Sequence, residues 1–265
     1  MWKKILTIIA SLMLIVGLGF LLFPPISNLI GKQQAESISD TFDRSKASAV
    51  KTYKDVETAE EAREEGYIDE EGYPINEEGE RVSDEKIVFA VDLERLYADS
   101  VAYNNNLKKG QGTVDDLDYS DPALSLEDYG IFDGVYCYIS APTIGMRLPV
   151  YLGANDYMMS YGAAHLASTS LPLDDKNTNC AIAGHTGYIG RIFFDNLRGL
   201  AIGDTVTITN YWDEIDYRVI ETKVVSPYDS SDVYIKKDRQ VLTLITCISA
   251  GNGLFNRYLV ICEKD

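Results

Sequence analysis

Seven short β-prone runs fill the C-terminal half of the chain and limit the folds that are open to it. Each run has five to nine residues, is rich in β-branched and aromatic side chains, and is bounded by turn-forming residues. The runs lie at 135–139, 147–152, 179–183, 205–209, 217–225, 241–246 and 257–262. Seven or eight such runs within about 130 residues are typical of a closed or nearly closed β-barrel. We therefore expect a mainly β domain whose helices are brief, at 153–164 and 193–200.

The last two runs bring a cysteine and an arginine together. Cys247 ends the run 241–246, and Arg257 begins the next one after nine residues that include Gly251, Asn252 and Gly253. Those turn residues predict a hairpin that returns the arginine beside the cysteine. A thiol next to a permanent cation is a setting that favours a thiolate and stabilises an oxyanion. The alternative is a buried structural cysteine and a surface arginine.

Only two histidines are available as a partner for Cys247. His185 ends an apolar run between Gly184 and Gly187, which let backbone or substrate approach closely. His165 lies in an apolar stretch without such a setting, and we expect it to be structural.

The types of these residues predict their roles. The Cys247 thiolate would attack a carbonyl, His185 would protonate the departing amine and later deprotonate an incoming one, and Arg257 would hold the substrate and the oxyanion. The chain order His, Cys, Arg does not fit a papain-like protease.

The remaining cysteines indicate neither a metal site nor a disulfide framework. Cys137, Cys180, Cys247 and Cys262 include no pair at metal-ligand spacing. Alternation along the last run places Cys262 on the face opposite Arg257, where it is expected to be a core residue. We therefore expect no metal and no cofactor.

The N-terminus carries a charge-free apolar run of 19 residues, 5–23, between Lys3-Lys4 and Pro24-Pro25. That length spans a bilayer core as a helix, and the lysines predict a cytoplasmic N-terminus with the rest of the chain outside the cell. The alternative is a cleaved signal peptide, whose apolar region is usually shorter, about 7 to 15 residues.

Most of the net charge of −17 belongs to one segment. Residues 55–85 carry 14 acidic and two basic residues, so the rest of the chain carries only −5, and nucleic acid is not an expected partner. The segment holds a short duplication, 66–72 and 72–79, and each copy ends in an acidic turn closed by glycine. We expect a partly disordered insertion here.

A helical pattern follows the insertion. Apolar residues recur three and four positions apart, with Ser100 as the one polar member of the face, and Gly110 and Gly112 end the pattern. The face consists of Phe89, Leu93, Leu96, Ser100, Tyr103 and Leu107. A helix of this length is marginal alone, so we expect it to pack on the barrel.

Four sets of residues stand out when they are taken in order: Gly184-His185-Thr186-Gly187, then Phe193 and Phe194-Asp195-Asn196-Leu197 with Gly203-Asp204, then Thr243-Leu244-Ile245-Thr246-Cys247, and Arg257. Together they resemble the sortases, the membrane-anchored cysteine transpeptidases of Gram-positive bacteria. The resemblance covers about 116–263. Further residues resemble the class C, pilus-assembling branch: Tyr103-Asn104, Leu148-Pro149-Val150-Tyr151, Ala164-His165-Leu166 and Thr169-Ser170-Leu171-Pro172.

The resemblance implies a closed eight-stranded barrel with His185, Cys247 and Arg257 in a groove on its outer surface. It implies cleavage of a sorting motif of the Leu-Pro-x-Thr-Gly kind after the threonine, through a thioacyl-enzyme. A pilin lysine would then resolve the intermediate, or alternatively the amine of a lipid-linked peptidoglycan precursor in wall anchoring. The implied partners are sorting-signal-bearing surface or pilin proteins and the membrane.

Two departures from class C bear on regulation and role. A candidate lid, 119–129, keeps Asp121-Pro122 but has Ala123 where an aromatic residue is common. By the resemblance, Asp121 could pair with Arg257 in a resting state, whereas turn chemistry alone also explains an Asp-Pro pair. The C-terminal membrane helix of many class C members is not present in this sequence, which weakens the pilus assignment relative to wall anchoring.

The expected organisation has five parts: 1–25 as cytoplasmic tip and transmembrane anchor, 26–54 as a membrane-proximal helical stalk, 55–85 as the acidic insertion, 86–115 as the helix on the barrel, and 116–265 as the catalytic barrel. A hypothesis of another class is a non-catalytic surface adhesin or binding module built on a β-barrel.

Overall fold

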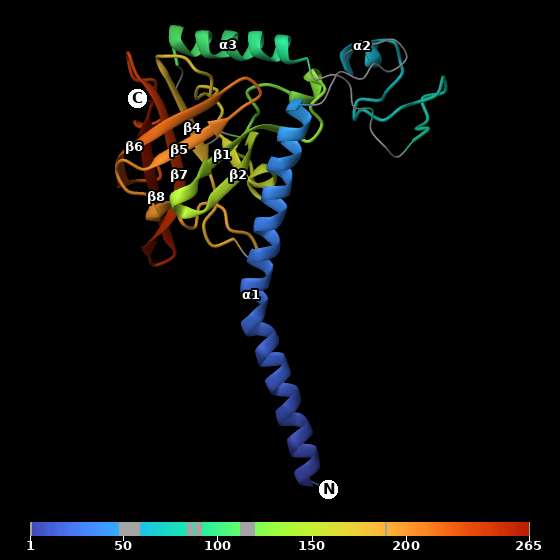
Figure 1. Ribbon diagram of the computed structural model, residues 1–265, viewed down its shortest axis with the longest axis vertical. Helices are drawn as coiled ribbons and strands as arrows, with labels where there is room; N and C mark the ends of the chain where they lie inside the picture. The colour runs from blue at the N-terminus through green and yellow to red at the C-terminus, as the bar shows by residue number, and fades with distance from the viewer. Residues whose placement is uncertain are drawn as a thin grey trace.

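Eight strands close into a barrel in the order β1-β2-β3-β4-β7-β8-β6-β5 (Figure 1). The computed structural model describes residues 2–47, 59–83, 87, 92–111, 120–188 and 190–264. The strands are Val135–Ala141 (β1), Met146–Leu152 (β2), Ala163–His165 (β3), Thr178–Ala183 (β4), Thr205–Thr209 (β5), Glu214–Val225 (β6), Gln240–Gly251 (β7) and Leu254–Glu263 (β8). The predicted mainly β class and the closed eight-stranded barrel are confirmed.

Two of the strand pairs are parallel, β2 with β3 and β4 with β7, and the other neighbours are antiparallel. β3 was not among the predicted runs, because three residues are too few to show alternation. It is a strand because it pairs with β2 over Val150, Tyr151 and Leu152. In the parallel pair β4–β7, Ala183 pairs with Ile245, so His185 and Cys247, each two residues further along the chain, lie on the same side of the barrel.

Short helices lie where the sequence predicts them. α4 (Asp156–Met159) falls within 153–164, and a single 3-10 turn, η3 (Leu197–Gly199), falls within 193–200. Two further 3-10 turns are η1 (Leu126–Tyr129) and η2 (Pro142–Ile144).

Large side chains fill the barrel, among them Tyr136, Tyr217 and Phe194, all almost fully buried. The Tyr136 hydroxyl donates a hydrogen bond of 3.0 Å to Ser100 Oγ on the helix α3 (Leu93–Lys109), so a polar group inside the core is satisfied. This explains why Ser100 lies on the apolar face of that helix.

α3 lies across one end of the barrel (Figure 1). Asp92 caps its N-terminus by accepting a hydrogen bond from the Arg95 N–H, and Gly110 ends it. The side-chain amide of Asn104 forms two hydrogen bonds with the backbone of Leu171. Its Nδ2 donates to the carbonyl at 3.0 Å, and its Oδ1 accepts from the N–H at 2.8 Å. The predicted face residue Phe89 lies outside the described residues.

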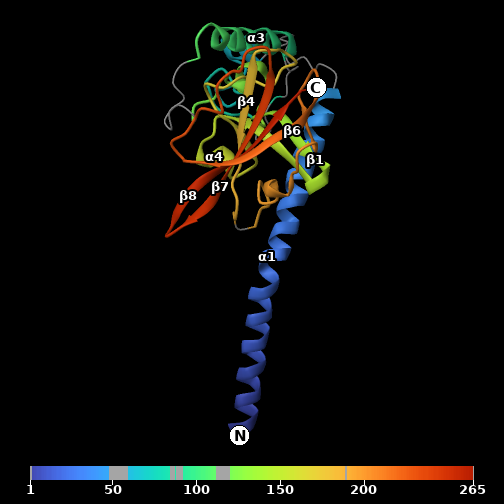
Figure 2. The same cartoon turned by 90° about the vertical axis from the view of Figure 1, so that its left-hand side faces the viewer.

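The N-terminal helix α1 (Trp2–Ala47) joins the apolar run to the segment expected as a stalk, with Pro24 and Pro25 inside the helix. Its last turns pack on the barrel, where Phe42 is fully buried and its ring lies 4.5 Å from that of Tyr211. Arg147 of β2 binds Asp40 and Asp43 of this helix. The first half of α1 extends away from the barrel (Figures 1 and 2).

The described part of the acidic segment, 59–83, consists of α2 (Ala59–Glu64) and two turns that match the duplication. Asp69 accepts hydrogen bonds from two backbone N–H groups in the first turn, and Asn76 does the same in the second. Gly72 and Gly79 adopt φ values of 90° and 79°, which explains the glycine that closes each copy. Residues 55–58, 84 and 85 of the expected insertion lie outside the described residues.

Candidate active site

Cys247 and Arg257 face each other directly across the β7–β8 ladder. The Arg257 guanidinium donates from Nη1 to Cys247 Sγ at 3.0 Å, and both side chains are half-buried. The hairpin that joins the strands turns through Gly251, Asn252 and Gly253, which all have positive φ. The predicted hairpin and the predicted juxtaposition of thiol and cation are thus present. A fixed cation at this distance stabilises negative charge on the sulfur or on an oxygen bound beside it.

His185 follows β4, at the same end of the barrel as Cys247. The backbone before it is fixed by a bond from the Gly184 N–H to the Ile245 carbonyl at 3.0 Å, and the backbone after it by the Phe194 N–H, which donates to the His185 carbonyl at 3.0 Å. The imidazole stacks on Tyr188 at a ring separation of 5.6 Å. Gly184 is required because a Cβ there would lie 2.6 Å from the Phe194 ring.

Two hydroxyl groups connect the histidine loop to the cysteine strand. Thr246 Oγ1 donates to the Gly184 carbonyl at 2.7 Å, and the hydroxyls of Thr186 and Thr246 are 2.6 Å apart. Thr246, which directly precedes Cys247, is therefore hydrogen-bonded to both residues that flank His185. Sequence reasoning missed this link because the partners lie about 60 residues apart, although both threonines belong to the motifs that carry the resemblance.

The Asp195 carboxylate closes the loop that begins at His185. It accepts hydrogen bonds from the Gly187 N–H at 2.8 Å and from the Phe193 N–H at 3.0 Å. Asp195 thereby sets the path of the backbone beyond the histidine without lining the groove itself.

A groove of about 360 Å³ contains all three predicted residues. Its lining combines apolar and polar side chains, so an extended peptide with both kinds of side chain fits its chemistry. The apolar lining includes Leu166, Val233, Ile245 and Leu259; the polar lining includes His185, Thr246, Cys247, Arg257, Asp229 and Asp232. Asp229, Asp232 and Val233 come from the loop after β6, which the sequence analysis did not single out.

The loop after β6 is held at the groove by buried polar groups. The Asn179 side chain donates to the carbonyls of Asp232 and Tyr234 at 2.7 and 3.1 Å. Asp232 also pairs with Lys223 at 2.8 Å, and this contact raises the pKa of Lys223. The wall of the groove that this loop forms is therefore fixed in position.

The other cysteines are buried and lie away from the groove. Burial raises the pKa of Cys137 and Cys180 well above the ordinary value for a thiol, and raises that of Cys262 to about 12. All four cysteines are free thiols, and Cys247 alone among them is not buried. Cys262 lies in the main core, as the alternation of the last strand predicts.

His165 is fully buried at the end of β3. Its Nε2 lies 3.2 Å from the Thr169 carbonyl oxygen and 3.1 Å from that of Ser170, an arrangement that suits a neutral ring whose N–H donates. Burial lowers the pKa of His165 to about 4. The residue is not part of the groove and has the structural role expected of it.

The candidate lid lies beside the groove rather than in it. Asn155 donates to the Ser120 carbonyl at 3.2 Å, and Gly153 leaves no room for a Cβ next to the same backbone. Asp121 and Pro122 are exposed, and within the described part of the chain no ion pair joins Asp121 to Arg257. Residue 119 lies outside the described residues, and the lid remains a prediction.

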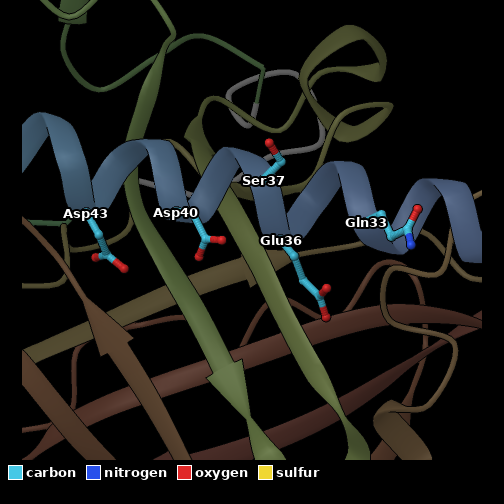
Figure 3. Close-up of a pocket in the computed structure, with 5 residues that line it drawn as sticks. All are labelled: Gln33, Glu36, Ser37, Asp40 and Asp43. Atoms are coloured by element: carbon cyan, nitrogen blue, oxygen red, sulfur yellow. The ribbon is translucent and has the colours of Figure 1, made fainter.

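A second hollow runs along α1 and is lined by Gln33, Glu36, Ser37, Asp40 and Asp43 (Figure 3). The acidic side chains have a structural explanation, because Arg147 binds Asp40 and Asp43. Within the described residues, no group of three or more histidine, cysteine or acidic side chains could hold a metal ion.

Comparison with known proteins gives matches to one family. The model of the sortase domain matches residues 139–265. Among curated relatives, sortase A of Bacillus anthracis is 28% identical over 122 residues, which are 46% of this chain and 56% of the relative. Sortase D of Bacillus subtilis is 25% identical over 109 residues, 41% of this chain and 52% of the relative. The chain thus spans about half the length of the curated relatives it matches.

Solved structures give broader coverage. A pilus-related sortase C of Group B Streptococcus is 29% identical, with a TM-score of 0.56 over 66% of this chain and 89% of the other. The sortase C of Clostridium perfringens, solved with the C-terminal cell wall sorting motif, is 28% identical, with a TM-score of 0.54 over 65% and 89% of the two chains. Residues 139–265 match the sortase-domain model, and the closed eight-stranded barrel that carries the groove has the sortase fold.

Proposed function

We propose that this chain is a membrane-anchored cysteine transpeptidase that cleaves a Leu-Pro-x-Thr-Gly-like motif between threonine and glycine. The observation that carries the proposal is the 3.0 Å contact of Arg257 with Cys247 Sγ, in a groove that His185 also lines. The family match supports the reaction class, because sortases are cysteine transpeptidases.

The reaction uses one nucleophile, one acid-base group and one cation. The Cys247 thiolate attacks the threonine carbonyl carbon, and Arg257 stabilises the oxyanion that forms. His185 gives a proton to the glycine nitrogen as the C–N bond breaks, which leaves a thioester on Cys247. An incoming amine then loses its proton to His185 and attacks the thioester, so that an amide forms and the thiolate leaves.

The acceptor amine that we favour is a pilin lysine. The support is the likeness to two sortase C structures, one described as pilus-related and the other solved with a sorting motif. The alternative acceptor is the amine of a lipid-linked peptidoglycan precursor. Supplying both amines to the enzyme together with one sorting peptide, and quantifying the two products, separates pilus polymerisation from wall anchoring.

The organisation we propose keeps the five parts expected from the sequence. One helix among the described residues is long and apolar enough to cross a membrane, by length and composition only, and a signal sequence would pass the same test. We place 5–23 in the bilayer, Lys3 and Lys4 in the cytoplasm and the barrel outside. The mass of the protein recovered from membranes distinguishes an uncleaved anchor from a signal peptide.

A covalent adduct is the direct test of the activity. Incubation with a sorting-motif peptide is expected to add the mass of the threonine-terminated fragment to the wild-type chain and to the Cys262→Ala variant, but not to Cys247→Ala. If no such peptide forms an adduct while glycans or host proteins bind, the chain is an adhesin and the proposal is wrong.

A further inference from the structure

The loop that follows His185 touches the anchor helix just beyond its apolar run. A Cβ on Gly31 would collide with the Gly190 carbonyl oxygen, and a Cβ on Gly190 would lie 3.4 Å from Ser27 Cβ. Ser27 is four residues past Phe23, a distance of about 6 Å along a helix. The headgroup layer on each side of a bilayer is of similar thickness, about 5 to 8 Å. If 5–23 spans the bilayer, this loop therefore lies at the membrane surface.

The β7–β8 hairpin projects from the same end of the barrel. β4 ends at Ala183, which pairs with Ile245, whereas β7 continues for six more residues to Gly251. Both views show the hairpin extending from the barrel on the side from which the first half of α1 leaves (Figures 1 and 2). The hairpin therefore points toward the surface from which the anchor emerges, with the pair of Cys247 and Arg257 at its base.

The tip of this hairpin is apolar and uncharged. Leu254 is 67% exposed and Phe255 is 55% exposed, and residues 248–256 contain no charged side chain. Burial of a charged side chain in a bilayer interface costs desolvation free energy, and this segment has no charged side chain to bury. Exposed leucine and phenylalanine side chains favour insertion there. The tip thus has the chemistry of an interfacial anchor.

The described part of the acidic segment, which an anionic bilayer would repel, lies at the other end of the barrel. The described acidic segment, 59–83, is attached to η1 through Arg63, which bonds the Glu127 carbonyl and lies 3.7 Å from Asp128. Figure 1 shows α2 near the end of the barrel covered by α3, away from the hairpin. The position of this acidic segment therefore favours contact of an anionic membrane with the hairpin end of the barrel over contact with the opposite end.

We propose that Leu254 and Phe255 insert into the interface of the bilayer that holds α1, so that the groove opens at the membrane surface. This inference rests on the proposed membrane anchor. A groove in this position takes donors or acceptors that are themselves held in the bilayer by an apolar segment or an acyl chain. The hairpin is thus a second attachment that fixes the orientation of the barrel.

Depth-dependent fluorescence quenching in the full-length chain tests the inference. A Trp2→Phe background removes the tryptophan of the anchor. Into this background, Phe255→Trp places a probe at the hairpin tip. Tyr97→Trp places a second, partly exposed probe on α3 at the opposite end, beside Trp212. The proteins are reconstituted into phosphatidylglycerol and phosphatidylcholine vesicles with or without brominated acyl chains, and the background variant supplies the signal of Trp212.

Brominated lipid is expected to reduce the emission of the Phe255→Trp probe by about twofold or more and to leave the Tyr97→Trp probe unchanged. Equal quenching of both probes, or of neither, overturns the inference. If the emission of the Phe255→Trp probe depends on protein concentration and not on brominated lipid, the hairpin tip contacts a second copy of the chain. This result also overturns the inference.

Two further readouts separate this inference from the proposed function. Flotation of the wild-type chain with vesicles tests the anchor, and adduct formation at Cys247 tests the chemistry. A chain that floats and forms the adduct but shows no quenching at the tip retains the proposed function and loses the inference. A Leu254→Ser, Phe255→Ser variant is expected to keep soluble-peptide cleavage and to lose several-fold in rate on a bilayer-held donor.

Discussion

The rim of the groove and the interior of the barrel hold the same reactive residue types in opposite environments. At the rim, Cys247 contacts a guanidinium and His185 stacks on a half-exposed ring, and both line an open groove. In the interior, Cys262 has a pKa raised to about 12 and His165 has one lowered to about 4, in both cases by burial. The comparison teaches that position in the barrel, and not residue type, separates structural from candidate catalytic side chains.

Removal of the sulfur at the rim should have the largest effect. Cys247→Ala is expected to lower transpeptidation by at least about 10³-fold, because the thioester has no other place to form. The matched interior variant, Cys262→Ala, should keep its activity and lose about 1 kcal/mol of unfolding free energy. Peptide turnover and urea unfolding measure the two effects. If the two variants had comparable activity, Cys247 at the rim would be no more important for catalysis than Cys262 in the interior.

Loss of the cation should come next. Arg257→Gln is expected to lower the rate of acylation by about 10² to 10³-fold, since the oxyanion loses its charged donor. Arg257→Lys keeps the charge without the planar fork of donors, so its acylation rate should lie between those of the wild type and Arg257→Gln. Single-turnover acylation is the measurement. A loss seen only in KM would assign Arg257 to substrate binding alone.

The hydroxyl link behind the rim should have a smaller effect. Thr246→Val removes the bonds to Gly184 and Thr186 at nearly constant shape, so we expect kcat to fall by about tenfold through displacement of His185. The free energy of unfolding should fall by about 1 to 3 kcal/mol, because the Gly184 carbonyl loses its donor. Thr246→Ser should restore kcat. A loss of stability with an unchanged kcat would leave Thr246 with a structural role only.

The interior histidine should affect stability and not chemistry. The pKa of His165 is about 4 in the folded chain and about 6.5 when unfolded, so the unfolded state binds more protons between these values. Its contribution to stability is complete above about pH 6.5 and is lost progressively as the pH falls toward 4. Unfolding of wild type and His165→Gln at several pH values measures this. An identical pH dependence in the two proteins would contradict the assignment.

Local pattern was sufficient wherever an interaction lay within one hairpin or one regular element. Alternation identified seven of the eight strands, and the glycines after Cys247 identified the hairpin that brings Arg257 back to it. β3 was not predicted, because a three-residue strand is too short to show periodicity and depends on its pairing with β2. The same limit hid the Thr186–Thr246 link and the loop of Asp232, whose partners are distant in sequence.

The packing of α1 was beyond the reach of sequence pattern for a different reason. The segment after the apolar run is polar, so its few buried residues, such as Phe42, do not form a visible stripe. Arg147 pairs with Asp40 and Asp43 from more than 100 residues away, and only the closed barrel brings them together.

The sequence by itself determined the class of fold, the hairpin that pairs Cys247 with Arg257 and the apolar N-terminal run, because each rests on periodicity or spacing along the chain. The tertiary structure alone decided that β4 and β7 lie parallel, which brings His185 to the groove of Cys247. It also decided that the first half of α1 leaves from the end of the barrel where the β7–β8 hairpin projects. Such arrangements depend on contacts between distant segments, and these form only when the barrel closes.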